Sequence, residues 1–475
     1  MSNQSRVESL KEKVAKLNSV SDTYCLAKWL QSTTTLYNGY THSCHHPAAH
    51  KIQISDIKQN PRGLHNTPIK LAARADMLQG VQTPECDYCW NIENLGQDHF
   101  SDRHYKSANP GMGFWPQLDA VVASGVGADI APSYLEVAFE NICNFKCSYC
   151  SPDVSSRWME EVEHYGGFPL PNGEVLHDLD WMRKVGRFPI HHKQDNPYIS
   201  AFWQWWPELY QSLDTFRITG GEPLLSQNTW KILEYVGANP RPGFKLGINT
   251  NMGVPRRLVE QLAAAVTELE GKIGEITIFT SAESVGRAAE YSRFGMDWTA
   301  FQENIEYFLE HTPSTVRLQF MTTVNILSVS TYHEFLEYVV QCRQRHGGPS
   351  RDRSRIGFST SYLRWPRHQS ITLLDAPQRA AFDQRLRDTY AAWSGDGKLE
   401  NFYIEEIDQI DRLLNYMHSV EPDPEQLDAF VGFFDEYDHR RGTRLLEVFP
   451  ELEATYLHGH EIRAKRIETG VPRSC

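Results

Sequence analysis

Three cysteines stand close together near the end of the first third of the chain. Cys143, Cys147 and Cys150 are separated by four and three positions, in a chain with only nine cysteines among 475 residues. Cysteine thiolates are the ligands of zinc ions and of iron–sulfur clusters. A cluster with four irons takes four ligands, so this loop would leave one iron open for a small molecule. The spacing therefore indicates a metal-binding loop.

The loop has the pattern CxxxCxΦC, in which Tyr149 is the aromatic residue. This pattern resembles the signature of radical S-adenosylmethionine (SAM) enzymes. The resemblance implies that the three cysteines hold a [4Fe–4S] cluster, that the amino and carboxylate groups of SAM chelate the open iron, and that Tyr149 lies near the adenine. It also implies that an electron from the cluster cleaves SAM to methionine and a 5′-deoxyadenosyl radical, which abstracts hydrogen from the substrate. A structural zinc loop is the alternative, although zinc sites favour paired CxxC or Cys/His spacing and four ligands.

A second motif, Gly220-Gly221-Glu222-Pro223, follows a strand-like run about 70 residues later. Glycines let the backbone approach a ligand closely, and a carboxylate beside strand-end carbonyls can receive an ammonium group. The motif resembles the GGEP sequence of the same family, which implies that Gly220, Gly221 and Glu222 bind the amino group of SAM. An ordinary turn is the alternative.

Ser281 and Arg293 resemble a Ser…Arg pair in anaerobic sulfatase-maturing enzymes and their relatives. That resemblance implies that the pair holds the SAM carboxylate, a task that suits a guanidinium because it grips a carboxylate through two hydrogen bonds. Glu283 could contact the ribose. The alternative for Arg293 is a surface position on a helix. Three asparagines at strand ends could face the same site or act as simple caps: Asn249, Asn251 and Asn325.

Four further cysteines lie nearer the N-terminus, at Cys25, Cys44, Cys86 and Cys89. Four thiolates form a full shell for one metal centre, and three histidines close to Cys44 also allow a Cys/His shell, so residue types alone leave zinc and iron–sulfur open. The segment resembles the auxiliary-cluster domains called SPASM or twitch, which implies an auxiliary [4Fe–4S] cluster. Such domains usually follow the radical SAM domain, whereas this segment precedes it.

The cysteine loop and the GGEP-like motif each follow a strand-like run. Strands are expected at 134–139, 215–219, 244–251, 275–281, 315–324 and 355–361, and helices at 5–18, 227–237, 255–270, 298–311 and 331–345. Near-continuous apolar strands that alternate with helices imply an α/β fold with a parallel sheet. Six such units match the partial (β/α)6 TIM-like barrel that the resemblance implies. In such barrels the chemistry takes place at the carboxyl ends of the strands.

Together with this pattern, the resemblance implies three regions. These are an N-terminal auxiliary-cluster domain at 1–115, a radical SAM core at 133–368 with an insertion at 151–213, and a C-terminal helical region at 369–475. Residues 98–132 have the Gly and Pro content of a linker, with a short helix around 116–123. The tryptophan-rich run at 198–207 could be a packing element or the wall of a substrate pocket.

The net charge of −13 argues against non-specific nucleic-acid binding. No apolar run approaches the length of a membrane span. An odd number of cysteines at short, metal-like spacings suits a reducing cytoplasm better than a disulfide scaffold.

The resemblance implies a cytoplasmic, oxygen-sensitive radical SAM enzyme, and it favours oxidation, dehydrogenation or cross-linking of a peptide or small metabolite. An electron donor such as flavodoxin or ferredoxin is the expected partner, and the auxiliary cluster would accept an electron from the substrate radical or ligate the substrate. A redox-neutral isomerase or epimerase is an alternative within the same class. A non-catalytic metal-binding scaffold is the alternative from another class.

Overall fold

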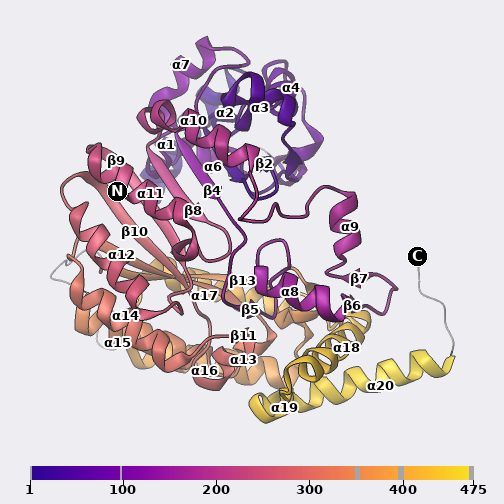
Figure 1. Ribbon diagram of the computed structural model, residues 1–475. Coiled ribbons are helices and arrows are strands. Elements are labelled where there is room, and N and C mark those ends of the chain that lie inside the picture. The colour runs from indigo at the N-terminus through magenta and orange to yellow at the C-terminus, as the bar shows by residue number, and fades with distance from the viewer. Residues whose placement is uncertain (1–2, 97–98, 348–353, 394–400, 470–475) are drawn as a thin grey trace.

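A large, mostly parallel sheet forms the centre of the fold (Figure 1). The computed structural model describes residues 3–96, 99–347, 354–393 and 401–469. Within the described residues the sheet has nine strands in the order β13-β12-β10-β9-β8-β4-β1-β2-β3. The strands from β13 to β1 pair in parallel, and β2 and β3 add antiparallel strands at the edge. Their bounds are β1 Gln31–Thr35, β2 Tyr40–His42, β3 His50–Lys51, β4 Tyr134–Ala138, β8 Thr215–Thr219, β9 Arg241–Thr250, β10 Ile273–Ser281, β12 Val316–Val324 and β13 Ile356–Tyr362.

The six predicted strands are confirmed as β4, β8, β9, β10, β12 and β13, and the fold is mixed α/β. The strands alternate in burial, however, and are not apolar on both faces. On β12, for example, Val316, Leu318 and Phe320 are buried, while the residues between them are only partly covered. One face of the sheet therefore packs into the hydrophobic core, and the other presents polar side chains. Closure of these strands into a partial barrel stays a prediction.

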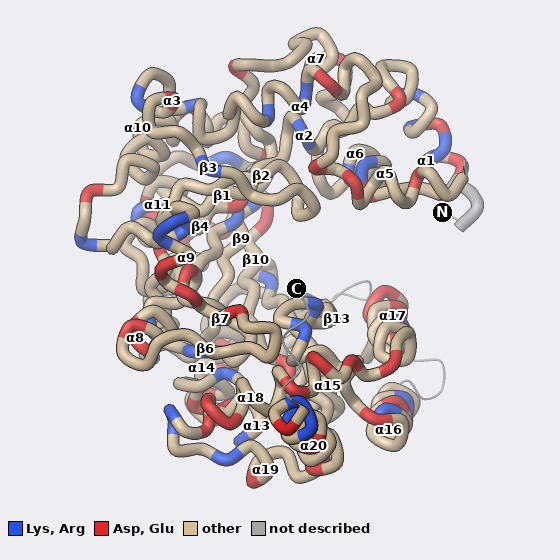
Figure 2. The backbone as a smooth tube through the Cα atoms, turned by 90° about the vertical axis from the view of Figure 1, so that its right-hand side faces the viewer, with Lys and Arg blue, Asp and Glu red and all other residues tan. Residues whose placement is uncertain are grey.

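Helices connect the strands and form the core on the buried face. Between the strands lie α11 Gln227–Ala238, α12 Arg256–Glu268, α13 Gly286–Ser292, α14 Trp298–His311 and α15 Tyr332–His346. The C-terminal region is helical as predicted, with α16 Ala376–Trp393, α17 Ile404–His418, α18 Pro424–Arg441, α19 Leu445–Val448 and α20 Glu453–Thr469. Lys and Arg as well as Asp and Glu are spread over the described part of the fold, and α17 is mainly acidic (Figure 2).

The N-terminal region joins the same sheet, because β1 pairs in parallel with β4 from Gln31↔Tyr134 to Thr35↔Ala138. Its helices are α1 Asn3–Asn18, α2 Leu26–Leu30, α3 Ile54–Gln59, α4 Pro68–Leu78, α5 Asp87–Glu93, α6 Asp102–Ala108 and α7 Leu118–Ala123. The prediction of a linker at 98–132 is wrong for residues 102–108, which form α6. This helix buries Arg103 and His104, and Ser107 Oγ accepts a hydrogen bond from the backbone of Leu26. Its Gly and Pro content made the segment resemble a linker, but the polar side chains of α6 have partners in the fold.

The insertion at 151–213 contains α8 Ser156–Tyr165, β6 Phe168–Pro169, β7 Val175–Leu176, α9 Leu179–Lys184 and α10 Pro197–Ser212. Helix α10 carries the tryptophan-rich run, and the packing interpretation of that run is confirmed. Trp206 is fully buried, and its ring centroid lies 4.9 Å from that of Phe216 and 5.5 Å from that of Tyr210. None of the described helices is both long and apolar enough to span a bilayer.

Replacing Trp206 by alanine should destabilise the fold, because the substitution leaves a large cavity between α10 and the sheet. We expect a loss of about 3–5 kcal/mol in the free energy of unfolding, measured by denaturant titration. Trp181→Ala is the matched control, since that side chain is 50% exposed. Equal losses in the two variants would contradict the packing role.

Candidate metal and cofactor site

The loop with Cys143, Cys147 and Cys150 follows β4 and is fixed by neighbouring elements. Its short strand β5 (Lys146–Cys147) pairs antiparallel with β11 (Arg293–Phe294). The indole of Trp158 donates to the Cys147 carbonyl at 2.9 Å, and Ser155 Oγ donates to the Phe145 carbonyl at 2.7 Å. The loop is therefore held in place by α8 and by the segment after α13.

The three thiols are close enough to influence one another. Burial raises the pKa of Cys143 to about 12, and the neighbouring Cys147 adds to this shift. Burial also raises the pKa of Cys147, and it raises the pKa of Cys150 well above its usual range, with further contributions from the other two sulfurs. Three bare thiolates would be costly here, whereas the positive charge of a bound metal centre would offset their mutual repulsion. The donor set thus fits a cysteine-ligated cluster.

The GGEP-like motif lies directly against this loop. The backbone N–H of Glu222 donates to the Ile142 carbonyl at 2.6 Å, and the N–H of Gly221 donates to the Glu140 carbonyl at 3.3 Å. A side chain at Gly221 would place its Cβ only 2.2 Å from the Ile142 oxygen. Gly220 has φ +123°, in the region that favours glycine. Both glycines are therefore needed for two distant segments to meet.

The Glu222 carboxylate is buried at the end of β8 and held by three donors. Thr250 Oγ1 and the backbone N–H of Leu224 donate to Oε1 at 2.8 and 3.0 Å, and the backbone N–H of Asn251 donates to Oε2 at 2.6 Å. Burial raises the pKa of Glu222 to about 7, although these hydrogen bonds oppose the shift. Pro223 begins the short helical turn after the carboxylate.

Arg293, Glu283 and Tyr149 form one buried cluster. Arg293 Nε donates to Glu283 Oε1 at 3.1 Å, and Arg293 Nη2 contacts Glu283 Oε2. The hydroxyl of Tyr149 donates to the same carboxylate at 3.1 Å. Arg293 Nη1 lies 3.8 Å from Cys147 Sγ. Two residues that the sequence analysis assigned to different parts of SAM are thus paired with each other, beside a cluster cysteine.

The remaining candidates divide between the site and the surrounding framework. Ser281 is the half-covered last residue of β10. Asn251 Nδ2 donates to Asn144 Oδ1 in the cysteine loop at 2.8 Å. Asn249 accepts a hydrogen bond from Arg217 on the polar face of the sheet. Asn325 is fully buried and caps the turn that follows β12, so the structure does not bring its amide to the cysteine loop.

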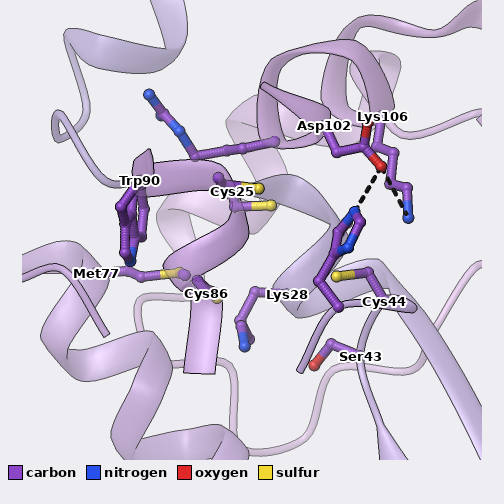
Figure 3. A pocket seen from close by; sticks show the side chains of 13 residues that line it. Cys25, Lys28, Ser43, Cys44, Met77, Cys86, Trp90, Asp102 and Lys106 are labelled. Atoms are coloured by element: carbon purple, nitrogen blue, oxygen red, sulfur yellow. Dashed lines mark hydrogen bonds and ion pairs between the residues drawn. The ribbon is translucent and has the colours of Figure 1, made fainter. Parts of the chain in front are cut away.

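The N-terminal cysteines share a second location. Cys25, Cys44, Cys86 and Cys89 line one cavity together with Lys28, and the sulfurs of Cys25 and Cys44 point into it from opposite sides (Figure 3). Burial raises the pKa of Cys25 to about 12, and the three other thiols contribute to this increase. The same cavity is bordered by a hydrogen bond between His46 Nε2 and Asp102 Oδ2 at 2.7 Å.

All eight cysteines in the described part of the chain are free. In those residues, no group of three or more Cys, His, Asp or Glu side chains has the close arrangement of a bound metal ion. The convergence of four thiols on one cavity nevertheless matches the donor set of a zinc or iron–sulfur centre.

A separate cavity of about 760 Å³ begins directly after Cys150. Its lining includes Asp153, Trp181, His177 and His368. His177 is 8% exposed and has φ +65°, and its Nε2 atom is buried without a hydrogen-bond partner in the described residues. Burial lowers the pKa of His177 to about 3, so the ring is neutral at pH 7.

Sequence reasoning missed His177, because a single histidine in an insertion has no spacing signal. Sequence reasoning also missed Thr250, which donates a hydrogen bond to Glu222. Asn249 and Asn251 are candidates because they are polar residues at the end of a strand, and Thr250 between them meets the same criterion.

Comparison with known proteins gives limited similarity. No protein-family model matches the chain. The molybdenum cofactor biosynthesis protein moc-5 of Caenorhabditis elegans is 27% identical over 173 residues, which are 36% of this chain and 22% of that protein. The match therefore spans about a fifth of the relative's length. Two structures of Streptococcus suis SuiB each align over 77% of this chain with a TM-score of 0.32. The structure bound to S-adenosylmethionine is 12% identical and is covered over 69% of its length. The structure bound to the precursor peptide SuiA is 13% identical and is covered over 70% of its length.

Gly221→Ala tests whether the two segments must touch. The new Cβ would overlap the Ile142 carbonyl, so we expect a loss of about 1–3 kcal/mol in the free energy of unfolding. The measurement is denaturant unfolding of the metal-free protein. Gly243→Ala is the control, since a Cβ there meets nothing within 4 Å. A Gly221 variant as stable as the wild type would show that the contact is dispensable.

Proposed function

We propose that the chain is a radical SAM enzyme. Cys143, Cys147 and Cys150 would hold a [4Fe–4S] cluster with one open iron, and the residues around Glu222 would hold SAM beside it. The observation that supports this most is the direct backbone contact of Glu222 and Gly221 with the cysteine loop. Two motifs that lie about 70 residues apart, each typical of the same chemistry, meet in one place.

When bound, the cluster supplies the electron that cleaves SAM to methionine and a 5′-deoxyadenosyl radical, which abstracts hydrogen from the substrate. The protein's own residues bind and orient the reactants. Glu222, fixed by three donors, would in its ionised form accept a hydrogen bond from the amino group of SAM. Ser281 would donate to its carboxylate.

Arg293 has a different proposed role from the one that the resemblance implies. Glu283 already engages two of its nitrogens, and the third faces Cys147. We therefore assign Arg293 to orienting Cys147 and stabilising its negative charge. Glu283 in turn fixes the hydroxyl of Tyr149, whose ring would adjoin the adenine.

The N-terminal cysteines would hold an auxiliary [4Fe–4S] cluster in a SPASM- or twitch-like arrangement. Lys28 borders the same cavity, and its charge opposes the burial that raises the pKa of Cys86. A second cluster could accept an electron from a substrate radical. That favours oxidation, dehydrogenation or cross-linking of a peptide or small metabolite, with flavodoxin or ferredoxin as the electron donor in the cytoplasm. The cavity after Cys150 lies in the size range of ligand sites, and we assign it to the substrate's approach.

Iron and acid-labile sulfide per chain, measured after anaerobic reconstitution, test the proposal. We expect about eight irons in the wild type and about four in a Cys143/Cys147/Cys150→Ala variant, because each cubane holds four. The wild type should also form 5′-deoxyadenosine from SAM and dithionite, and the variant should not. A reconstituted wild type that neither binds nor cleaves SAM would refute the proposed function. A different result would be about four irons in the wild type, nearly none in the variant, and zinc in the protein. That result would make the N-terminal site structural and would favour redox-neutral chemistry.

The pKa of Glu222 gives a pH dependence for SAM binding. Below pH 7 the carboxyl group gains a proton and loses the negative charge that accepts a hydrogen bond from the amino group of SAM. The dissociation constant of SAM should therefore be roughly tenfold larger at pH 6 than at pH 8. Anaerobic calorimetry on the reconstituted protein measures it, with iron content checked at each pH. Glu222→Gln should bind SAM weakly at both values, and a variant that keeps the wild-type slope would show that another group titrates.

A further inference from the structure

A buried glutamine from the segment after β13 grips the cysteine loop. Gln369 is fully buried at the end of the short helical turn Arg367–Gln369. Its side-chain amide binds Ser148 at two points. Nε2 donates to the Ser148 carbonyl at 3.0 Å, and Oε1 accepts a hydrogen bond from Ser148 Oγ at 2.8 Å. The amide of Gln369 thus clamps the residue that directly follows Cys147, although the two are 221 positions apart.

Ser148 uses all of its polar groups in fixing the loop. Its backbone N–H donates to the Ser292 carbonyl at 2.8 Å, and its carbonyl and hydroxyl both bind Gln369. The residue is 1% exposed, so water does not reach it in the folded state. A buried carbonyl that loses its donor is costly, and the loop would have to shift to find another partner.

The same amide also contacts the wall of the large cavity. Gln369 Nε2 lies 3.4 Å from Nε2 of His368, which is 2% exposed and lines the cavity of about 760 Å³. Burial lowers the pKa of His368 to about 3, so the ring is neutral and has one nitrogen that can accept a hydrogen bond. A primary amide has two N–H groups, one for the Ser148 carbonyl and one for this ring.

The cavity meets the loop at a second point, through His177. The ring of His177 lies against that of Trp158, with 4.9 Å between the centroids, and the indole of Trp158 donates to the Cys147 carbonyl at 2.9 Å. The carbonyls of two consecutive loop residues are therefore each bonded to a side chain that touches a histidine of the cavity. The cavity wall and the cysteine loop form one packed unit.

We infer that Gln369 is a positioning residue, which fixes the cysteine loop relative to the large cavity. It acts on the loop through Ser148 and on the cavity through His368. Radical chemistry needs the reacting atoms at contact distance, and a displacement of about 1 Å can cost about a hundredfold in rate. The inference rests on the proposed function, which gives the loop its cluster and the cavity its substrate, but the clamp can also be measured on the metal-free chain.

Gln369→Met tests the inference, because methionine has a similar length and lacks the amide. On the anaerobically reconstituted full chain, we would record the electron paramagnetic resonance spectrum of the reduced cluster with and without SAM, and the rate of 5′-deoxyadenosine formation at saturating SAM. We expect wild-type iron content, altered g-values in the SAM-bound spectrum, and a rate about tenfold to a hundredfold lower. The dissociation constant of SAM should stay near its wild-type value, because Glu222 keeps its own donors.

Gln409→Met is the matched control. Gln409 Oε1 accepts a hydrogen bond from the backbone N–H of Thr360 at 2.6 Å, away from the cysteine loop, so this variant should keep the wild-type spectrum and rate. Ser148→Ala removes one of the two clamp bonds and should alter the g-values as well. Adding Ser148→Ala to Gln369→Met should cost little more, since the partner is already lost. Ser148→Ala also keeps the inference testable if Gln369→Met fails to fold.

A Gln369→Met protein with the wild-type spectrum and rate would overturn the inference, and so would equal losses in Gln409→Met. A wild type that fails to cleave SAM would refute the proposed reaction and leave the clamp to hydrogen exchange on the metal-free full chain. There the backbone amide of Ser148 should exchange about tenfold faster in Gln369→Met than in the wild type, while the amides of β8 stay unchanged. Equal exchange at Ser148 would overturn the clamp itself.

Discussion

The backbone hydrogen bond from Glu222 to the Ile142 carbonyl joins the ends of two neighbouring strands, and the candidate site is organised around it. It requires that residue 221 have no side chain, because a Cβ would occupy the space of the carbonyl. Once formed, it places the carboxylate beside the cysteine loop and within reach of Thr250 and the backbone of Asn251. A carboxylate buried this deeply is acceptable only because those donors compensate for lost hydration.

The cysteine loop is also braced from outside the sheet by α18. Glu161 binds Lys146 of the loop and Arg441 of α18, at 2.6 and 2.8 Å. Tyr437, also on α18, donates to the Tyr291 carbonyl at 2.7 Å, next to the strand that pairs with the loop. The C-terminal helices therefore do more than cover the core. They fix the elements on which the thiols are mounted, through charged and aromatic contacts that exclude water.

Much of the fold could be predicted because hydrophobic periodicity and turn residues are local signals. The six core strands and the helices between them follow from such runs, and the two cysteine groups follow from spacing. Pairings between distant residues could not be predicted in this way. The Arg293–Glu283 pair and the contact of Arg103 with the Tyr24 carbonyl each depend on which segments meet. Apolar and polar residues alternate along the sequence of β12. The expectation of a parallel sheet nevertheless led to the prediction that both faces of the strands are apolar.

The parallel pairing of β1 with β4 affects how the chain can fold. Gln31 pairs with Tyr134, so the partners are 103 positions apart, and β1 leaves the ribosome long before the strand it needs. Until then its backbone donors and acceptors must remain hydrated or find temporary partners. Non-local parallel pairing of this kind is slow, because loop-closure entropy is lost before the contacts form. The same pairing covers the edge of β4, which would otherwise be an open template for another chain. The N-terminal strands thus protect the core sheet from aggregation. They also continue into the segments that contain Cys25 and Cys44.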